Sequence, residues 1–168
     1  MREVSNANFG LLIAYILPGF VLLWGLEPYS PTLAVWLNPP QENAATIGGF
    51  LYGTIAAVGL GMLLSTIRWL IVDSILGRTG IRLPAVSFKA LRESGEALDR
   101  LVDYYYRYYQ CHANSLVASC LLIPLRWGSH GFRPFEVFLF LGIAVILWLG
   151  SRDTLRKYGA GLHDILGQ

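Results

Sequence analysis

The chain has 168 residues, of which 54% are hydrophobic and only 14% are charged. A soluble domain usually carries about a quarter charged residues, so this composition excludes an ordinary soluble protein and indicates a membrane protein. The two cysteines, Cys111 and Cys120, lie about 13 Å apart if they share one helix, at 1.5 Å per residue. That separation excludes a disulfide between them.

Four stretches are apolar enough to predict helices that cross a bilayer: residues 5–26, 44–67, 108–125 and 134–151. A hydrocarbon core of about 30 Å needs about 20 helical residues, and backbone polar groups in lipid must be paired internally. The fourth stretch is short and needs Glu136 at the interface. We predict an all-α fold with a single four-helix transmembrane domain.

The first stretch could instead be a cleaved signal peptide. It is too long for a signal-peptide core, and no small-x-small cleavage site follows Leu26. We therefore expect a retained span. Within it, Pro18 cannot donate a backbone hydrogen bond and crowds the carbonyl of Ala14, which predicts a kink near the middle of the membrane.

Basic residues predict the orientation of the chain. Eleven of the 13 lysines and arginines lie before the first span, between the second and third, or in the tail 152–168; only Arg126 and Arg133 lie on the other side. The positive-inside rule then places both termini on the cytoplasmic side of the membrane, with a cytosolic helical segment at 77–107. That segment could receive a cytosolic protein partner. Topology already accounts for its basic residues, so we do not expect nucleic acid as a partner.

Small residues recur every fourth position in the second span: Gly49, Gly53, Ala57, Gly61 and Ser65. Such a stripe allows close approach of helices in lipid, where hydrophobic attraction between helices is absent. It predicts packing either within the chain or between subunits of a homo-oligomer, and it does not separate the two. At the end of this span we expect Arg68 to lie at the interface as a snorkelling topology anchor.

The third span is the most polar. We expect one helix from about Gly95, capped by Ser94, to Leu125, followed by a tight turn at 127–134 that makes the third and fourth spans an antiparallel hairpin. An interfacial girdle is predicted for five tyrosines, namely Tyr104, Tyr105, Tyr106, Tyr108 and Tyr109. Deeper in the span, His112, Asn114, Ser115 and Ser119 are expected to face the bundle interior, a partner helix or a pore.

Catalytic and metal-binding motifs are scarce. Arg107 and His112 match the Arg-x4–6-His spacing that resembles the RNase motif of HEPN domains, in which the two residues act on an RNA phosphodiester. Such a short match is weak on its own. His130 and His163 have no second ligand at metal spacing, so neither a metal nor another cofactor is expected.

Two further resemblances concern the whole chain. The run Tyr106-Arg-Tyr-Tyr-Gln110 with Asn114, and the Leu17-Pro-Gly-Phe20 entry, resemble uncharacterised four-span bacterial inner-membrane proteins. In size and topology the chain is similar to membrane accessory proteins and effectors of bacterial antiphage systems, some of which form pores. This resemblance implies a homo-oligomeric pore or membrane-perturbing effector. The alternatives are a non-catalytic accessory subunit of a larger membrane complex and a membrane-anchored HEPN-like RNase.

Overall fold

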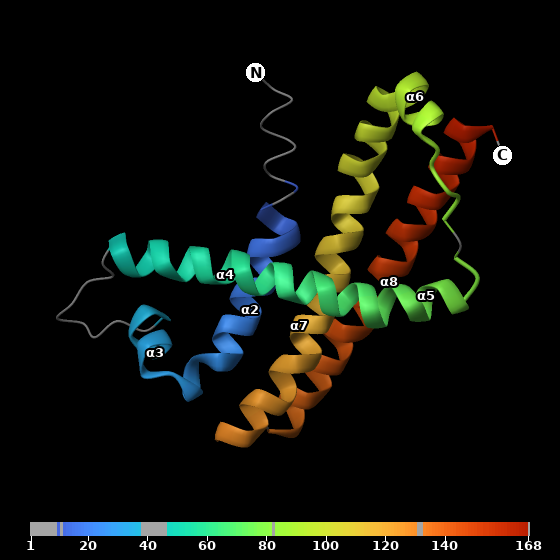
Figure 1. Cartoon of the computed structure of the whole chain (residues 1–168). Coiled ribbons are helices and arrows are strands. Elements are labelled where there is room, and N and C mark those ends of the chain that lie inside the picture. Colours follow the sequence, from blue (N-terminus) through green and yellow to red (C-terminus); the bar gives the residue numbers. More distant parts are fainter. Residues whose placement is uncertain (1–9, 11, 38–46, 82, 131–132, 168) are drawn as a thin grey trace.

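The computed structural model describes residues 10, 12–37, 47–81, 83–130 and 133–167. Within these ranges the fold is all-helical, without a strand, which confirms the all-α prediction (Figure 1). In chain order the elements are η1 (Leu12–Ile16), α2 (Leu17–Leu26), η2 (Glu27–Tyr29), α3 (Pro31–Leu37), α4 (Ile47–Arg68), η3 (Trp69–Asp73), α5 (Ser74–Arg78), α6 (Phe88–Leu101), η4 (Val102–Tyr106), α7 (Arg107–His130) and α8 (Pro134–Leu166). The predictions for residues 1–9 and 44–46, including Arg2, lie outside the described residues.

Three of these short elements are π-helical turns inside longer helices. η1 leads into α2, η3 joins α4 to α5, and η4 joins α6 to α7. A π turn inserts one extra residue into an α-helix and often marks a functional site. Within the described ranges, four long helical segments result: η1–α2, α4–η3–α5, α6–η4–α7 and α8.

Three helical stretches of the described chain are long and apolar enough to cross a membrane: Leu12–Tyr29, Gly48–Arg78 and Pro134–Leu166. They indicate a multi-pass membrane protein. The third predicted span, in α7, is not among them. The reason is composition, because α7 carries polar side chains such as Gln110, His112 and Asn114. This helix also lies at the centre of the fold, where it packs against η1, α2, α4 and α8. Neighbouring helices shield its polar side chains, so this helix does not need the apolar character of a lipid-facing one.

The helices do not form four parallel rods. α7 and α8 lie side by side, as the hairpin prediction requires, and α2 packs along α7. The long helix α4–η3–α5 instead runs across α2, α7 and α8 (Figure 1). It contacts α2 near its middle and α7 near Arg68. The number of membrane crossings therefore stays a prediction.

Several element boundaries differ from the sequence predictions. α8 is one uninterrupted helix of 33 residues, so the tail from residue 152 continues the fourth predicted span. α7 extends to His130, which shortens the predicted turn before Pro134. Ser94 has non-helical backbone angles (φ −130°, ψ 25°) and kinks α6, so the helix that continues into η4 and α7 begins after Ser94, where the sequence predicts its start. A shorter helical segment from Phe88 precedes the kink.

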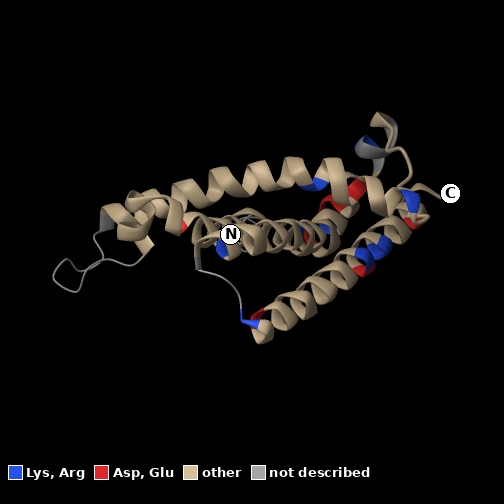
Figure 2. Ribbon diagram, turned by 90° about the horizontal axis from the view of Figure 1, so that it is seen from below, with Lys and Arg blue, Asp and Glu red and all other residues tan. Residues whose placement is uncertain are grey.

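Charged side chains are unevenly distributed. Figure 2 shows long stretches without charge, and the charged residues gather mainly toward the end of the molecule where the C-terminus lies. In α4 the single charged residue is its last one, Arg68, and in α8 no charge occurs between Glu136 and Arg152. This distribution is compatible with apolar segments embedded in a bilayer. The cytoplasmic location of the termini stays a prediction.

Candidate functional site

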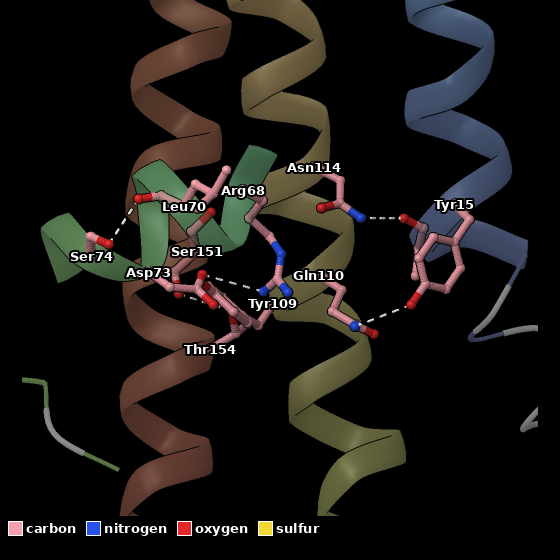
Figure 3. Close-up of polar contacts among 11 residues, drawn as sticks. Tyr15, Arg68, Leu70, Asp73, Ser74, Tyr109, Gln110, Asn114, Ser151 and Thr154 are labelled. Carbon is pink, nitrogen blue, oxygen red and sulfur yellow. Dashed lines mark hydrogen bonds and ion pairs between the residues drawn. The ribbon is translucent and has the colours of Figure 1, made fainter. Parts of the chain in front are cut away.

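A buried polar cluster lies where the end of α4 crosses α7 (Figure 3). The Arg68 side chain pairs with Asp73, with Nη1 at 3.4 Å from Oδ1, and its guanidinium carbon lies 5.0 Å from the centre of the Tyr109 ring. The Tyr109 hydroxyl donates a hydrogen bond to the same Asp73 oxygen. Arg68 is only 4% exposed and Tyr109 1%. Three side chains from two helices thus share one ion pair, one hydrogen bond and one cation–π contact.

The π turn η3 explains how Arg68 and Asp73 meet. On a regular α-helix, residues five positions apart point about 140° away from each other, at 3.6 residues per turn. The wider turn at Trp69–Asp73 brings the two side chains to the same face. The pair therefore depends on local backbone geometry that the sequence spacing does not suggest.

This arrangement corrects the expected role of Arg68. The sequence predicts an isolated, snorkelling arginine, but the Arg68 side chain is buried and its Nε has no hydrogen-bond partner among the described residues. A buried charge is costly unless it is paired, and Asp73 supplies that pairing from within the same long helix. An ionised pair inside an apolar helix is by default a candidate functional feature.

The tyrosines divide into two groups. Tyr104, Tyr105 and Tyr108 are exposed, which suits the predicted interfacial girdle. Tyr106 is half-buried and lies 5.1 Å from the Tyr158 ring of α8, while Tyr109 is fully buried in the polar cluster. The last tyrosine is therefore a core residue, which corrects its assignment to the girdle.

A second polar contact joins α7 to the first helix. Asn114 is fully buried, and its Nδ2 donates a hydrogen bond of 2.8 Å to the Ala14 carbonyl. Pro18 has no N–H, so the usual i→i−4 bond to that carbonyl cannot form. The amide of Asn114 therefore satisfies a backbone group that the proline leaves without its regular donor. Nearby, Gln110 Nε2 lies 3.4 Å from the Tyr15 hydroxyl (Figure 3).

The predicted polar face of α7 points into the molecule. Asn114, Ser115 and Ser119 are buried, and His112 packs against Gly150 of α8, where any added Cβ would lie 2.9 Å from the imidazole Cδ2. Three polar atoms on this face are buried without a hydrogen-bond partner in the described chain: His112 Nδ1, Asn114 Oδ1 and Ser115 Oγ. Of the three environments considered from the sequence, namely the bundle interior, a partner helix or a pore, this face of α7 lies in the bundle interior in the described fold.

The HEPN-like pair is not brought together within the chain. Arg107 lies beside Gly10 and pairs with Asp103 at 3.4 Å, whereas His112 faces α8. No group of three His, Cys, Asp or Glu residues that could hold a metal ion occurs in the described ranges. Neither observation supports a hydrolytic centre.

The residues of the small-residue stripe lie in two different environments. A Cβ on Gly61 would collide with the Tyr15 backbone, and a Cβ on Gly19 of α2 would collide with the Ala57 backbone. At Gly53 an added Cβ would meet nothing within 4 Å. The middle of the stripe therefore packs against the first helix, while the part near Gly53 makes no such close contact. Gly49 and Ser65 are half-buried.

An open groove of about 750 Å³ lies between η1 and α4. Leu12 and Ile16 line one side, and α4 lines the other from Val58 to Arg68. Sequence patterns did not predict it, because a groove between two helices depends on how the helices pack.

Comparison of the chain with protein-family models, curated proteins and solved structures finds no match.

Proposed function

We propose that the protein is a membrane-perturbing effector and that the described fold is its closed form. The observation that carries this proposal is the concentration, on the buried face of α7, of polar atoms that have no hydrogen-bond partner in the described chain. Each such atom costs about 1–3 kcal/mol relative to a hydrogen-bonded or hydrated one. The closed packing therefore contains a local free-energy cost that hydration would remove.

A rearrangement that exposes this face to water would give α7 a polar lining. His112, Asn114, Ser115 and Ser119 lie along the predicted third span, so their side chains would follow the path of an aqueous opening. Polar residues at membrane depth commonly mark such pathways. In this proposal several copies assemble in the bacterial inner membrane, with both termini cytoplasmic, and α7 lines the opening between or within them. A role in a stress or antiphage response is what the sequence resemblance implies.

Release of a trapped fluorescent dye from liposomes tests the proposal. The wild-type protein is expected to release dye in a manner that depends steeply on the protein-to-lipid ratio, because assembly precedes opening. Ser115→Ala together with Ser119→Ala is expected to reduce release, since it removes the two hydroxyl groups from the lining with little change in side-chain volume. Vesicles that remain tight over the whole range of ratios, with protein correctly inserted, would refute the proposal.

The second candidate is an accessory subunit of a larger membrane complex, and the surface of α8 favours it. The apolar part of this helix is largely uncovered: Phe135, Phe138, Leu141, Val145, Ile146 and Leu149 are all exposed. In the membrane such a face contacts lipid or another helix. Native mass spectrometry separates the candidates, because self-assembled oligomers without a second protein support the effector, while a stable monomer that co-purifies with one defined partner supports the subunit.

A further inference from the structure

We propose that the groove between η1 and α4 is a binding site for one anionic phospholipid, with an acyl chain along α4 and the headgroup at Arg68. This inference requires only that the groove faces the membrane. It does not depend on the proposed pore, and it concerns the closed form of the protein.

The groove has the polarity of a lipid. On the α4 wall, Val58 and Met62 lie toward one end, and Leu12, Tyr15 and Ile16 line the groove from the first helix. Toward the other end of that wall lie Ser65, Thr66 and Arg68, followed by Trp69. These ends are separated by ten residues of helix, roughly 15 Å at 1.5 Å per residue. A long apolar wall that ends in hydroxyl and guanidinium groups matches an amphiphile and not a polar metabolite.

The volume and the charge restrict the occupant further. About 750 Å³ is within the range of roughly 300–1,000 Å³ typical of small-molecule sites. Arg68 is the charged residue of the lining, and its one anionic partner, Asp73, lies at 3.4 Å, which is long for a charge-assisted hydrogen bond. Its Nε has no acceptor in the described chain. A phosphate oxygen is the acceptor that a guanidinium binds best.

Unlike ordinary annular lipid, a lipid in this site should show headgroup selectivity. Phosphatidylglycerol carries a negative phosphate without a compensating amine, whereas the choline of phosphatidylcholine cancels that charge. The protein, delipidated in neutral detergent and titrated with either lipid, is expected to bind one phosphatidylglycerol per chain by native mass spectrometry, with about tenfold preference over phosphatidylcholine.

Two threonines of α4 provide a matched test. Thr66 lies in the groove and donates its hydroxyl to the Met62 carbonyl, four residues earlier; Thr54 makes the same type of bond to the Phe50 carbonyl and does not line the groove. Thr66→Phe fills the groove and is expected to abolish retention of both lipids. Thr54→Phe is expected to bind like the wild type.

A double variant tests the role of the guanidinium. Arg68→Gln with Asp73→Asn leaves no lone buried charge, and it is expected to lose the preference for phosphatidylglycerol while still binding phosphatidylcholine. If the wild type binds both lipids equally, the bound molecules are annular lipid only and the proposal is overturned. Equal retention by Thr66→Phe and Thr54→Phe overturns it as well, even if the double variant fails to fold. Because binding is measured on closed protein in detergent, absence of dye release from liposomes does not affect the result.

Discussion

Asn114 of α7 donates a 2.8 Å hydrogen bond to the carbonyl of Ala14, the backbone group that Pro18 deprives of its regular helical donor. The two residues are 100 positions apart in the sequence. Pro18 of α2 and Asn114 of α7 are therefore linked energetically through the Ala14 carbonyl, although their side chains are not hydrogen-bonded to each other.

Asn114→Ala should destabilise the folded protein by about 1–3 kcal/mol, because the Ala14 carbonyl then remains buried without this donor. The free energy of unfolding in mixed detergent micelles, titrated with a denaturing detergent, measures the effect. Pro18→Ala restores an N–H, so the loss caused by Asn114→Ala should be smaller in that background. Strictly additive effects of the two substitutions would contradict the proposed link.

Asp73→Asn should be more harmful than Tyr109→Phe. The first leaves the guanidinium of Arg68 buried without its counterion and is expected to cost about 3 kcal/mol, the lower end for buried pairs because Asp73 is partly exposed. The second removes only one hydrogen bond, which is worth about 1 kcal/mol. The same unfolding measurement ranks the two.

The combined change of Arg68→Met and Asp73→Leu provides the control for that ranking. It removes both charges and leaves neither partner uncompensated, so it should cost less than Asp73→Asn alone. If the double variant were the least stable of the three, the ion pair would contribute more than the penalty of burying it.

Gly61→Ala and Gly53→Ala separate the two parts of the small-residue stripe. Gly61 lies against the backbone of Tyr15, so even one methyl group should force the first helix away, at a cost of about 1–3 kcal/mol. Gly53 is buried, but a Cβ added there would meet no atom within 4 Å, so alanine should leave the monomer as stable as the wild type. Gly59 is exposed, and an added Cβ would also meet nothing within 4 Å, so it serves as a second control.

The oligomeric mass of the protein in detergent tests whether the small-residue stripe also contacts another subunit. Gly53→Leu should reduce oligomers in detergent if the part of the stripe near Gly53 contacts another subunit, as the sequence prediction allows. Unchanged oligomer mass for Gly53→Leu, with Gly61→Ala destabilised, would restrict the stripe to packing within the chain.

The two native cysteines report on the opening of α7. Cys111 is half-buried one turn before Ser115, on the side that is proposed to become hydrated, while Cys120 is exposed on the outer surface of the helix. In liposomes, a membrane-impermeant thiol reagent should modify Cys111 in step with dye release and leave Cys120 unmodified within lipid. Cys120→Ala and Cys111→Ala isolate the two thiols. Dye release without modification of Cys111 would exclude this face as the lining.

Much of the helical framework follows from the sequence. Uncharged length predicts the helices, and Pro18 identifies the backbone defect near Ala14. The partner of that defect could not be predicted, because it depends on how two distant helices dock. The same holds for Arg68 and Asp73: their spacing of five argues against a contact on an α-helix, and only the π turn brings them together. The one sequence feature that could have indicated this contact is the presence of an arginine and an aspartate in the same otherwise apolar helix.

Tyr109 illustrates a second limit of sequence patterns. Five tyrosines near a membrane boundary suggest a common role, but burial depends on which face of the helix meets a neighbour. The helical period alone distinguishes faces and does not say which one is covered. The position of α4 across α7 decides it, and no local pattern encodes that crossing.

The unbroken course of α8 has a mechanical consequence. Its 33 residues span about 50 Å at 1.5 Å per residue, well beyond the roughly 30 Å of a hydrocarbon core. Near its C-terminal end, the Leu101 side chain of α6 packs directly against Gly161. The helix contains neither an internal proline nor a π turn that could absorb strain. A displacement of α6 at Gly161 would therefore move α8 as a rigid helix and shift Gly150 against the imidazole of His112.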